Sequence, residues 1–485
     1  MFDIEPEDLY DIQLNELLGA LSHALDMTEG QPAGHCVRCC WIGTSIGRAM
    51  GLSDAQLSDL YYTLLLKDLG CSSNAARICQ LYLADDLDFK RDFKQIDGSL
   101  PKVLRFVLAH TGLKAGLAER FRAMLNIIQN GGEIARELIE TRCMRGASIA
   151  RQLRFSEDVA QAIAALDEHW GGSGKPEGTA AMAIPLYARI ALLAQVIDVF
   201  HTAEGAGIAL QEIRRRSGSW FDPSLVATFE AVAEDPRFWS GLQAGDLQAR
   251  ILALDPARRR MRLDDDYLDD IATAFAQVVD SKSPFTAGHS ERVALFTDMI
   301  AEALGMTPAR RRWLKRTALL HDIGKLGVSN SILDKPGKLD EAEFAAMKEH
   351  AAFSETILSR VAAFGDLARV AGAHHERLDG KGYPRGLSGD QICMATRIIT
   401  TADIFDALTA DRPYRAAMPI SKALSIMAES LGTALDPVCF DALQRALAKI
   451  QPEKAAGGTQ RPPSGARKSH VRQPGQALTQ ARRTG

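Results

Sequence analysis

The stretch that decides the fold and the site runs from Thr317 to Arg415. It contains HDIGK at residues 321–325, HHERLDGKGYP at residues 374–384 and DIFD at residues 403–406. With His289 and His350, these motifs place five of the eleven histidines between positions 289 and 375. Histidine is the commonest metal ligand among side chains, and here histidines alternate with carboxylates. The pattern predicts a metal centre built from several segments.

Outside these motifs, apolar residues recur at helical spacing. Residues 310–320 and 358–373 are examples, and runs of alternating β-branched residues are few. A period of three to four residues is typical of helices with one buried face. The sequence therefore predicts an all-α protein.

The chain also contains an internal repeat. Gly34-His35 followed by Lys67-Asp68-Leu-Gly70 has the layout of Gly288-His289 followed by His321-Asp322-Ile-Gly324, with equal spacing between the two parts. Further similarities join residues 167–176 to 375–384, Arg189 to Arg397 and residues 220–223 to 434–437. We interpret this self-similarity as a tandem duplication of one helical domain, with extra residues in the first copy around Asp85 to Ile128.

The first copy lacks most of the candidate ligands. The predicted equivalents are His35 for His289, Lys67 for His321, Asp68 for Asp322, Arg142 for His350, Leu166 for His374, Asp167 for His375 and Gln195 for Asp403. Cations at two ligand positions and an apolar side chain at a third cannot hold divalent metals. The first copy is therefore predicted to fold without catalysing.

These observations divide the chain into four parts. Residues 1–240 are predicted to form the degenerate domain, 241–270 a charged linker with a helix, 271–450 the catalytic domain and 451–485 a disordered tail. The linker contains Arg258-Arg259-Arg260 and Asp264-Asp265-Asp266 and leads into a helix expected over Tyr267–Asp280. The tail has seven Lys and Arg against one Glu and too few apolar residues to pack. Contact of this basic tail with RNA or lipid headgroups is left open beside a plain solvated tail.

Bulk composition restricts the functional classes. The net charge of −4 gives no reason to expect nonspecific nucleic-acid binding, and no specific nucleic-acid partner is expected. The N-terminus is acidic and lacks a signal-peptide layout, and the apolar stretch 183–200 is interrupted by Arg189, Gln195 and Asp198. Eight cysteines without an export signal suggest a reduced, cytoplasmic protein without membrane attachment. Cys36 to Cys40 beside His35 could bind metal or act in redox chemistry, but small buried cysteines are the preferred interpretation.

The spacing of the candidate ligands suits a pair of divalent metals. Two such ions ~3.5–4 Å apart can clamp a phosphate and activate the attacking water, which requires a carboxylate able to bridge them. Adjacent helical residues point about 100° apart, so His321 can serve one ion while Asp322 bridges both. His374 and His375 can serve from one helix end. The remaining ligands, expected from three other helices, are His289, His350 and Asp403.

Several residues near the ligands suit phosphate contact. Lys325 lies four residues after His321, which would place it on the same helix face and offer an ammonium to a phosphate oxygen. Arg412 and Arg415 follow Asp403 and could pair with phosphate, or they could be exposed helix arginines. The segment 379–384 is predicted to be a loop that borders the site. Asp406 could support the ligands or cap a helix.

From about Ala272 to Ala448, the chain resembles the HD-GYP family of metal-dependent phosphohydrolases. HDIGK and HHExxDGKGYP carry the resemblance. It implies an all-α bacterial enzyme that hydrolyses cyclic di-GMP to pGpG and GMP with two divalent ions, typically iron or manganese. It also implies metal ligation by His289, His321, Asp322, His350, His374, His375 and Asp403. Asp322 and Lys325 would then be catalytic, with substrate contact by Lys325, Tyr383, Arg412 and Arg415.

One position departs from part of that family. Some members carry a glutamate four residues before the first histidine, which supports a third metal, and here that position is Phe285. A binuclear centre is therefore expected. The residues also accept nickel, cobalt or zinc.

Other functions remain open at this point. The same ligands would serve a phosphohydrolase of another cyclic dinucleotide, such as mixed cyclic GMP-AMP, or of another nucleotide. The chain could also be a nonenzymatic protein that docks signalling partners through the Gly-Tyr-Pro loop or the degenerate domain. The first copy could form a homodimer, gate the second copy or bind a ligand in its vestigial pocket.

Overall fold

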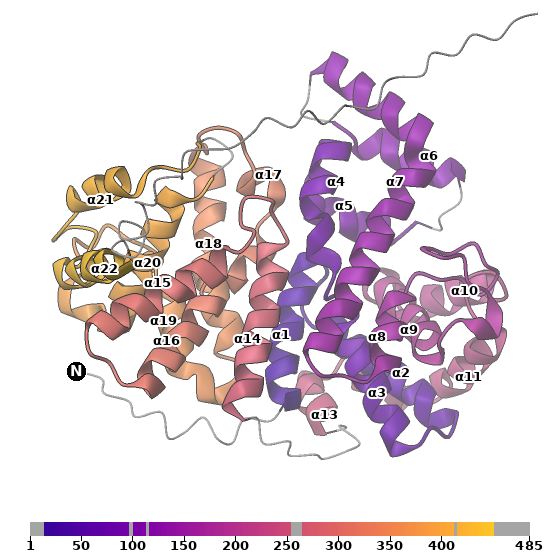
Figure 1. Cartoon of the computed structure of the whole chain (residues 1–485). Coiled ribbons are helices and arrows are strands. Elements are labelled where there is room, and N and C mark those ends of the chain that lie inside the picture. Colours follow the sequence, from indigo (N-terminus) through magenta and orange to yellow (C-terminus); the bar gives the residue numbers. More distant parts are fainter. Residues whose placement is uncertain (1–13, 97–99, 113–115, 254–263, 412–414, 451–485) are drawn as a thin grey trace, which may run out of the picture.

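The computed structural model describes residues 14–96, 100–112, 116–253, 264–411 and 415–450, and in these residues the chain is all-α (Figure 1). They contain no β-strand, and extended pairing is limited to isolated bridges. The fold class predicted from helical periodicity is confirmed.

The first half of the chain lies on one side of the molecule in Figure 1, in indigo to magenta. Its α-helices are α1 (Leu14–Thr28), α2 (His35–Ala49), α3 (Asp54–Leu66), α4 (Ala75–Tyr82), α5 (Asp86–Phe93), α6 (Leu100–His110), α7 (Leu117–Gln152), α8 (Glu157–Ala164), α9 (Leu186–Glu204), α10 (Ala206–Arg216), α11 (Pro223–Ala233), α12 (Pro236–Leu242) and α13 (Leu247–Ala253). Short 3-10 helices are η2 (Cys71–Asn74) and η3 (Ala181–Ala183). The insertion expected around residues 85–128 corresponds to α5, α6 and the first part of α7.

The second half lies on the other side, in orange to yellow. Its α-helices are α14 (Asp265–Asp280), α15 (His289–Ala303), α16 (Pro308–Leu320), α17 (Asn330–Leu333), α18 (Glu341–Leu358), α19 (Gly365–Gly372), α20 (Met394–Thr409), α21 (Ile420–Ala428) and α22 (Pro437–Ile450). Its 3-10 helices are η4 (Ile323–Gly327), η5 (Ala362–Phe364) and η6 (Gly389–Gln391). The helix expected over Tyr267–Asp280 is present as α14.

The two halves repeat one another in local detail. Gly34 and Gly288 precede α2 and α15 with φ of 86° and 67°, a left-handed conformation that favours glycine. In both halves this glycine is the N-cap residue, so the first residue of the helix is the histidine that follows it. Later in each half, an arginine donates a hydrogen bond of 2.7 Å to an aspartate directly before a later helix, α11 in the first half and α22 in the second. These pairs are Arg189–Asp222 and Arg397–Asp436.

The halves are not separate cores. One continuous cluster of buried apolar residues includes members of both halves, and α1 of the first half packs against η4 and α18 of the second. A Cβ added at Gly327 in η4 would lie 2.2 Å from Cε of Met27 in α1. The absence of a side chain at Gly327 thus lets α1 approach the segment that carries the candidate site.

Helix α9 is long and apolar enough to cross a membrane by length and composition, and 72% of its most apolar window is buried inside the protein. It packs against α2, α8 and α10. Its apolar character follows from its place in the core. Two of the polar residues that interrupt it in sequence, Gln195 and Asp198, are also buried.

The segment predicted as a charged linker contains packed structure. Leu247 and Ile251 of α13 are buried, and Asp265 and Asp266 at the start of α14 pair with arginines of α16. The run Arg258-Arg259-Arg260 and the tail 451–485 lie outside the described residues.

Candidate metal centre

Histidines at helix ends form the candidate centre. His321 and Asp322 directly follow Leu320, the last residue of α16, and His374 follows the end of α19. Three histidines share one orientation, in which Nδ1 bonds to the carbonyl three residues earlier. These bonds are His321 to Ala318 (2.7 Å), His350 to Met347 (2.5 Å) and His374 to Ala371 (2.5 Å). Because Nδ1 donates to the backbone, Nε2 of each ring is left as a potential ligand atom.

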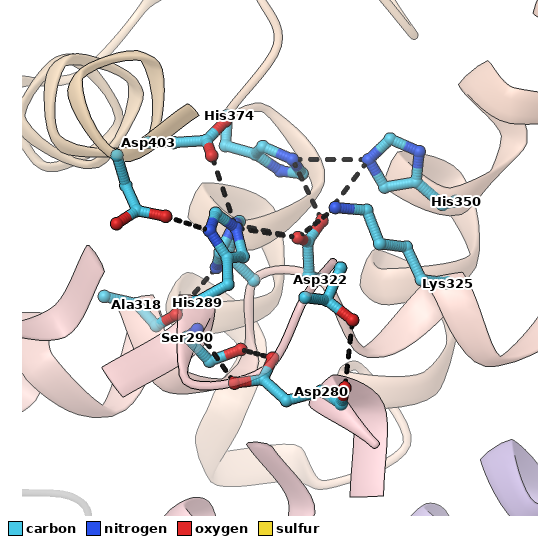
Figure 2. A network of polar contacts seen from close by, with 12 residues as sticks. Asp280, His289, Ser290, Ala318, Asp322, Lys325, His350, His374 and Asp403 are labelled. Carbon is cyan, nitrogen blue, oxygen red and sulfur yellow. Dashed lines mark hydrogen bonds and ion pairs between the residues drawn. The ribbon is translucent and has the colours of Figure 1, made fainter. Parts of the chain in front are cut away.

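The carboxylate of Asp322 lies between two pairs of histidines (Figure 2). Its Oδ2 is 3.3 Å from Nε2 of both His289 and His321. Its Oδ1 is 3.5 Å from Nε2 of His350 and 3.7 Å from Nε2 of His374. Asp322 can therefore bridge two ions, each held by a different pair of imidazoles.

His289 is held from both sides. Its Nδ1 is 2.7 Å from Oδ2 of Asp406, and its Nε2 is 3.4 Å from Oδ1 of Asp403. Arg292, one turn along α15, donates to the other oxygen of Asp406 at 2.6 Å. Of the two roles considered for Asp406, support of a ligand and capping of a helix, the structure favours the first. Its carboxylate fixes the ring of His289 on the side away from the other candidate ligands.

The residues present fit a pair of divalent cations. Buried Nε2 atoms of His289 and His321 and Oδ1 of Asp322 have no hydrogen-bond partner among the described residues. Such atoms are costly to bury unless something binds them. The seven predicted ligands occur in three overlapping groups whose ligand atoms lie within 4.8 Å of one another. The groups are His289–His321–Asp322, His321–His374–Asp403 and His350–His374–His375. Imidazoles with carboxylates suit iron, manganese and other divalent transition metals.

Electrostatics keeps most of these groups in the state that ligation requires. Burial lowers the pKa of His374 to about 3, and it also lowers the pKa values of His350 and His375. Burial alone would raise the pKa of Asp322, but His321 and Lys325 hold it well below its usual range. For His289, burial alone would lower the pKa, but the nearby carboxylates of Asp322 and Asp406 outweigh it and raise the pKa to about 9. Metal binding at neutral pH would therefore release a proton from His289.

Lys325 lies beside the centre but not on the helix that the sequence predicted. Helix α16 ends at Leu320, so the expected shared helix face with His321 is wrong, and Lys325 belongs to the 3-10 helix η4. The tighter turn brings Nζ of Lys325 into contact with Oδ2 of Asp322 (Figure 2). Lys325 thus places its ammonium next to the bridging carboxylate.

A cavity of about 810 Å³ opens beside the centre. Lys325, His350, His375 and Tyr383 form its metal side. Further lining residues are Ser283, Phe285, Thr286, Ile332, Leu333, Lys335, Gly337, Lys338, Leu339, Phe344 and Met347. The volume lies in the range that small-molecule sites occupy, roughly 300–1,000 Å³. Lys335, Lys338 and Phe344 were not predicted as site residues, although the Lys-Pro-Gly-Lys sequence at 335–338, ahead of the capped helix α18, is a visible signal of a turn.

The predicted loop 379–384 borders the cavity. The ring of Tyr383 lies 4.8 Å from that of His375 between centroids, inclined by 33°. Buried Glu376 accepts hydrogen bonds from the backbone N–H groups of Arg385 and Leu387, which fixes the end of the loop. Gly380 adopts φ of 74°, as a turn of this kind requires.

The arginines proposed for substrate contact are less well supported. Arg412 lies outside the described residues. The guanidinium of Arg415 donates to the carbonyls of Ala407 and Leu408 at 2.5 Å and 2.9 Å, and Arg415 does not line the cavity. It satisfies carbonyls at the end of α20, so this geometry gives no support to its predicted phosphate contact.

The corresponding place in the first half is filled by the chain itself. Nζ of Lys67 lies 3.0 Å from Nε2 of His35 and contacts the carboxylate of Asp68. Arg142 and Asp167, which replace two further ligands, pair with one another. His35–Cys39–Asp198 and Glu29–Asp68–Cys71 are also close enough to share an ion. Cations of the chain already neutralise the carboxylates in both groups, namely Arg38 at Asp198, Lys67 at Asp68, and Lys90 and Lys94 at Glu29.

Comparison with known proteins identifies the class. The family model described as HD domain matches residues 99–225 and 273–438, one stretch in each half. The chain belongs to the HD domain family, and its motifs place it in the HD-GYP group.

Individual relatives narrow this further. The chain is 61% identical over 434 residues to the 3'3'-cGAMP-specific phosphodiesterase 3 of Vibrio cholerae, covering 90% of this chain and 94% of the relative. A solved structure, described as a cyclic GMP-AMP specific phosphodiesterase (V-cGAP3) of V. cholerae, superimposes with a TM-score of 0.64 at 55% identity, covering 91% of this chain and 99% of that one. The cyclic di-GMP phosphodiesterase response regulator RpfG of Xanthomonas campestris is 36% identical, covering 43% of this chain and 54% of the relative.

Proposed function

We propose that the protein is a metal-dependent phosphodiesterase that hydrolyses cyclic dinucleotides at the centre in its second half. The carboxylate of Asp322, set between two pairs of histidine Nε2 atoms beside a cavity, carries the proposal. A pair of cations held there needs a ligand that reaches both, and Asp322 is the residue with that geometry.

The side chains of the centre have distinct roles in this proposal. His289, His321 and Asp403 would hold one cation, His350, His374 and His375 the other, and Asp322 both. Bound there, two divalent cations supply Lewis acidity to a phosphate and lower the pKa of a water molecule. Iron and manganese are the proposed metals.

Residues of the chain would position the substrate. The ammonium of Lys325 lies beside the carboxylate of Asp322 and can neutralise a non-bridging phosphate oxygen bound there. Tyr383 and Phe344, whose rings are 6.4 Å apart between centroids, offer apolar faces to a nucleobase in the cavity. The cavity walls would hold the phosphodiester against the centre and keep the opposite nucleotide away from bulk water.

The mixed dinucleotide 3'3'-cGAMP is our first candidate substrate, and cyclic di-GMP, which the motifs predicted, is the second. The relative that shares 61% identity along nearly its whole length is named for 3'3'-cGAMP, whereas RpfG, named for cyclic di-GMP, matches over 43% of this chain. Both substrates present the same phosphodiester to the centre, so the ligands alone do not distinguish them.

A substrate panel tests the proposal. Protein loaded anaerobically with Fe²⁺ or Mn²⁺ is expected to cleave 3'3'-cGAMP with a higher kcat/KM than cyclic di-GMP, and chromatography separates linear dinucleotide from mononucleotide products. Asp322→Ala should abolish turnover, while Lys67→Met/Asp68→Asn, which removes both charges of the buried pair at the matched position of the first half, should retain it. Intact substrates with every metal preparation would refute the function. A kcat/KM that favours cyclic di-GMP would reverse our order of substrates.

A further inference from the structure

Helix α5 of the first half contributes a buried carboxylate to the second half. Asp86, the first residue of α5, has a relative exposure of 0%. Its Oδ1 accepts hydrogen bonds from the backbone N–H of Asn330 at 2.8 Å and from Oγ of Ser329 at 3.1 Å. Its Oδ2 lies 3.6 Å from Nζ of Lys282, which is also buried. The carboxylate is thus compensated mainly by groups of the other half.

These partners lead directly to the candidate site. Lys282 also donates to the carbonyl of Leu326 in η4 at 3.2 Å, one residue after Lys325. Asn330 donates from its side chain to the carbonyl of Lys282 at 2.7 Å and to Asp334 at 2.7 Å. The network therefore ties together the ends of the segment 326–334, whose Ile332 and Leu333 line the cavity.

The other side of α5 faces the vestigial site of the first half. Nζ of Lys90 donates to the carbonyls of Thr28 and Cys71, each at 3.0 Å, and Nζ of Lys94 lies 2.7 Å from Oε2 of Glu29. By the spacing of the repeat, Cys71 and Glu29 correspond to Lys325 and Ser283, two residues that line the cavity of the second half. The inserted segment 86–94 thus fills the first site with Lys90 and Lys94 and contacts the second half through Asp86.

We infer that Asp86 is a positioning residue for substrate binding in the second half, acting across the boundary through Lys282, Ser329 and Asn330 on the cavity wall formed by α17. This inference rests on the proposed function for its kinetic part. A buried carboxylate fixes its partners because leaving any of them unpaired is costly. Loss of its charge would leave Lys282 buried without a counter-ion and loosen the segment between η4 and α17.

Hydrogen–deuterium exchange on the full-length, metal-loaded protein tests the inference without reference to turnover. Asp86→Asn keeps the shape of the side chain and removes its charge, and we expect amides of residues 326–334 to exchange about tenfold faster. The matched control is Asp88→Asn, which changes an exposed carboxylate of the same helix, 64% accessible and paired with Arg91. Exchange of 326–334 in the control should equal that of the wild type. Equal exchange in Asp86→Asn and wild type would overturn the positioning role.

Steady-state kinetics with 3'3'-cGAMP gives the second readout. Because α17 lines the substrate cavity and carries none of the candidate ligands, KM should rise about tenfold in Asp86→Asn while kcat falls less than about threefold. Bound metal should be unchanged. A drop in kcat with an unchanged KM, or an equal change in Asp88→Asn, would count against the inference.

Two further variants keep the test decisive. Ser329→Ala removes one hydrogen bond from the other side of the boundary and should raise KM in the same direction by a smaller factor, even if Asp86→Asn folds poorly. In a double-mutant cycle, the effects of Asp86→Asn and Lys282→Met on KM should be non-additive, and additive effects would show that the two residues act independently. If the wild type hydrolyses no cyclic dinucleotide, the proposed function fails, and the exchange comparison still decides whether Asp86 holds the segment.

Discussion

The ammonium of Lys67 lies 3.0 Å from Nε2 of His35. In the second half, the imidazole of His321 takes the corresponding position beside His289. Lys67 is buried and contacts Asp68, the counterpart of Asp322. A covalently attached cation therefore stands in the first half at the place that corresponds to the candidate metal centre. The ammonium of Lys67 explains how the first half keeps a buried carboxylate without an ion.

Removal of the ammonium should destabilise the first half. Lys67→Met leaves Asp68 buried without a counter-charge, and breaking a buried pair on one side costs about 3–5 kcal/mol. The double variant Lys67→Met/Asp68→Asn should recover much of that loss, because it removes both charges. Urea denaturation of the full-length protein measures both values. Equal losses in the single and double variants would contradict the idea that Lys67 serves as the counter-ion.

Metal content should depend on Asp322 more than on any single histidine. Asp322 lies near four imidazoles, whereas His375 belongs to a single ligand group. Elemental analysis is expected to show a loss of about two ions per chain in Asp322→Ala and about one in His375→Ala. Lys67→Met/Asp68→Asn, which removes both charges of the buried pair, is the control from the first half and should leave the content unchanged. Full metal content in Asp322→Ala would rule out the bridging role.

Asp406 should increase the affinity for metal, because it contacts Nδ1 of the candidate ligand His289 and holds its ring in place. Replacing a carboxylate that orients a ligating histidine typically lowers affinity about 10–100-fold, and we expect this for Asp406→Asn. The first half provides a matched control, since Asp198 contacts Nδ1 of His35 at 2.6 Å and pairs with Arg38 in the same arrangement. Competition with a chelator measures the affinity. A comparable loss in Asp198→Asn would point to a general loss of packing instead.

Self-comparison explains how much of the site could be predicted from sequence. Residues that differ between the two halves, such as His321 and Lys67, indicate the candidate metal ligands. Residues that are the same in both halves indicate contacts that hold the helices in place. Asp26 and Asp280 each lie nine residues before the first histidine and accept a hydrogen bond from the N–H that follows it in α2 and α15. The same comparison would have found this pair, because it appears at equal spacing in both copies.

Other features depend on information that local sequence does not contain. The contact between Asp86 and Lys282 arises from how the two halves dock, and no periodic pattern reports that arrangement. The place of Lys325 was missed because helical spacing was extended past Leu320, where the chain changes to a 3-10 turn. Arg415 was assigned to phosphate from its charge, but unsatisfied carbonyls at the end of α20 bind it instead.

Acid should destabilise the protein through His35. Burial and, secondarily, Lys67 lower its pKa from 6.5 to about 4, although Asp198 opposes the shift. The unfolded chain then binds a proton at higher pH than the folded chain does. The stability is fully present above pH 6.5 and is lost as the pH falls towards 4.

At about pH 4.5 this loss is on the order of 2 kcal/mol. Urea midpoints of metal-free protein at neutral and acidic pH should therefore lie closer together in His35→Gln than in the wild type. Asp26, whose pKa is raised to about 6 by burial, acts in the opposite direction and remains in both proteins, so it does not account for the difference. An unchanged gap between the midpoints would exclude His35 as a source of acid sensitivity.

Gly324 should be intolerant of any side chain, because the loop that carries Asp322 touches the backbone of α18. A Cβ there would lie 2.0 Å from the carbonyl oxygen of His350 and 2.6 Å from the backbone nitrogen of Ser354. Gly324→Ala must therefore push η4 away from α18, at a cost of about 1–3 kcal/mol or more. It would also separate Asp322 from His350, so metal content and turnover should fall together. Gly365→Ala is the control, since a Cβ at that position would meet no atom within 4 Å. Normal metal content in Gly324→Ala would show that the two segments can separate without loss of the centre.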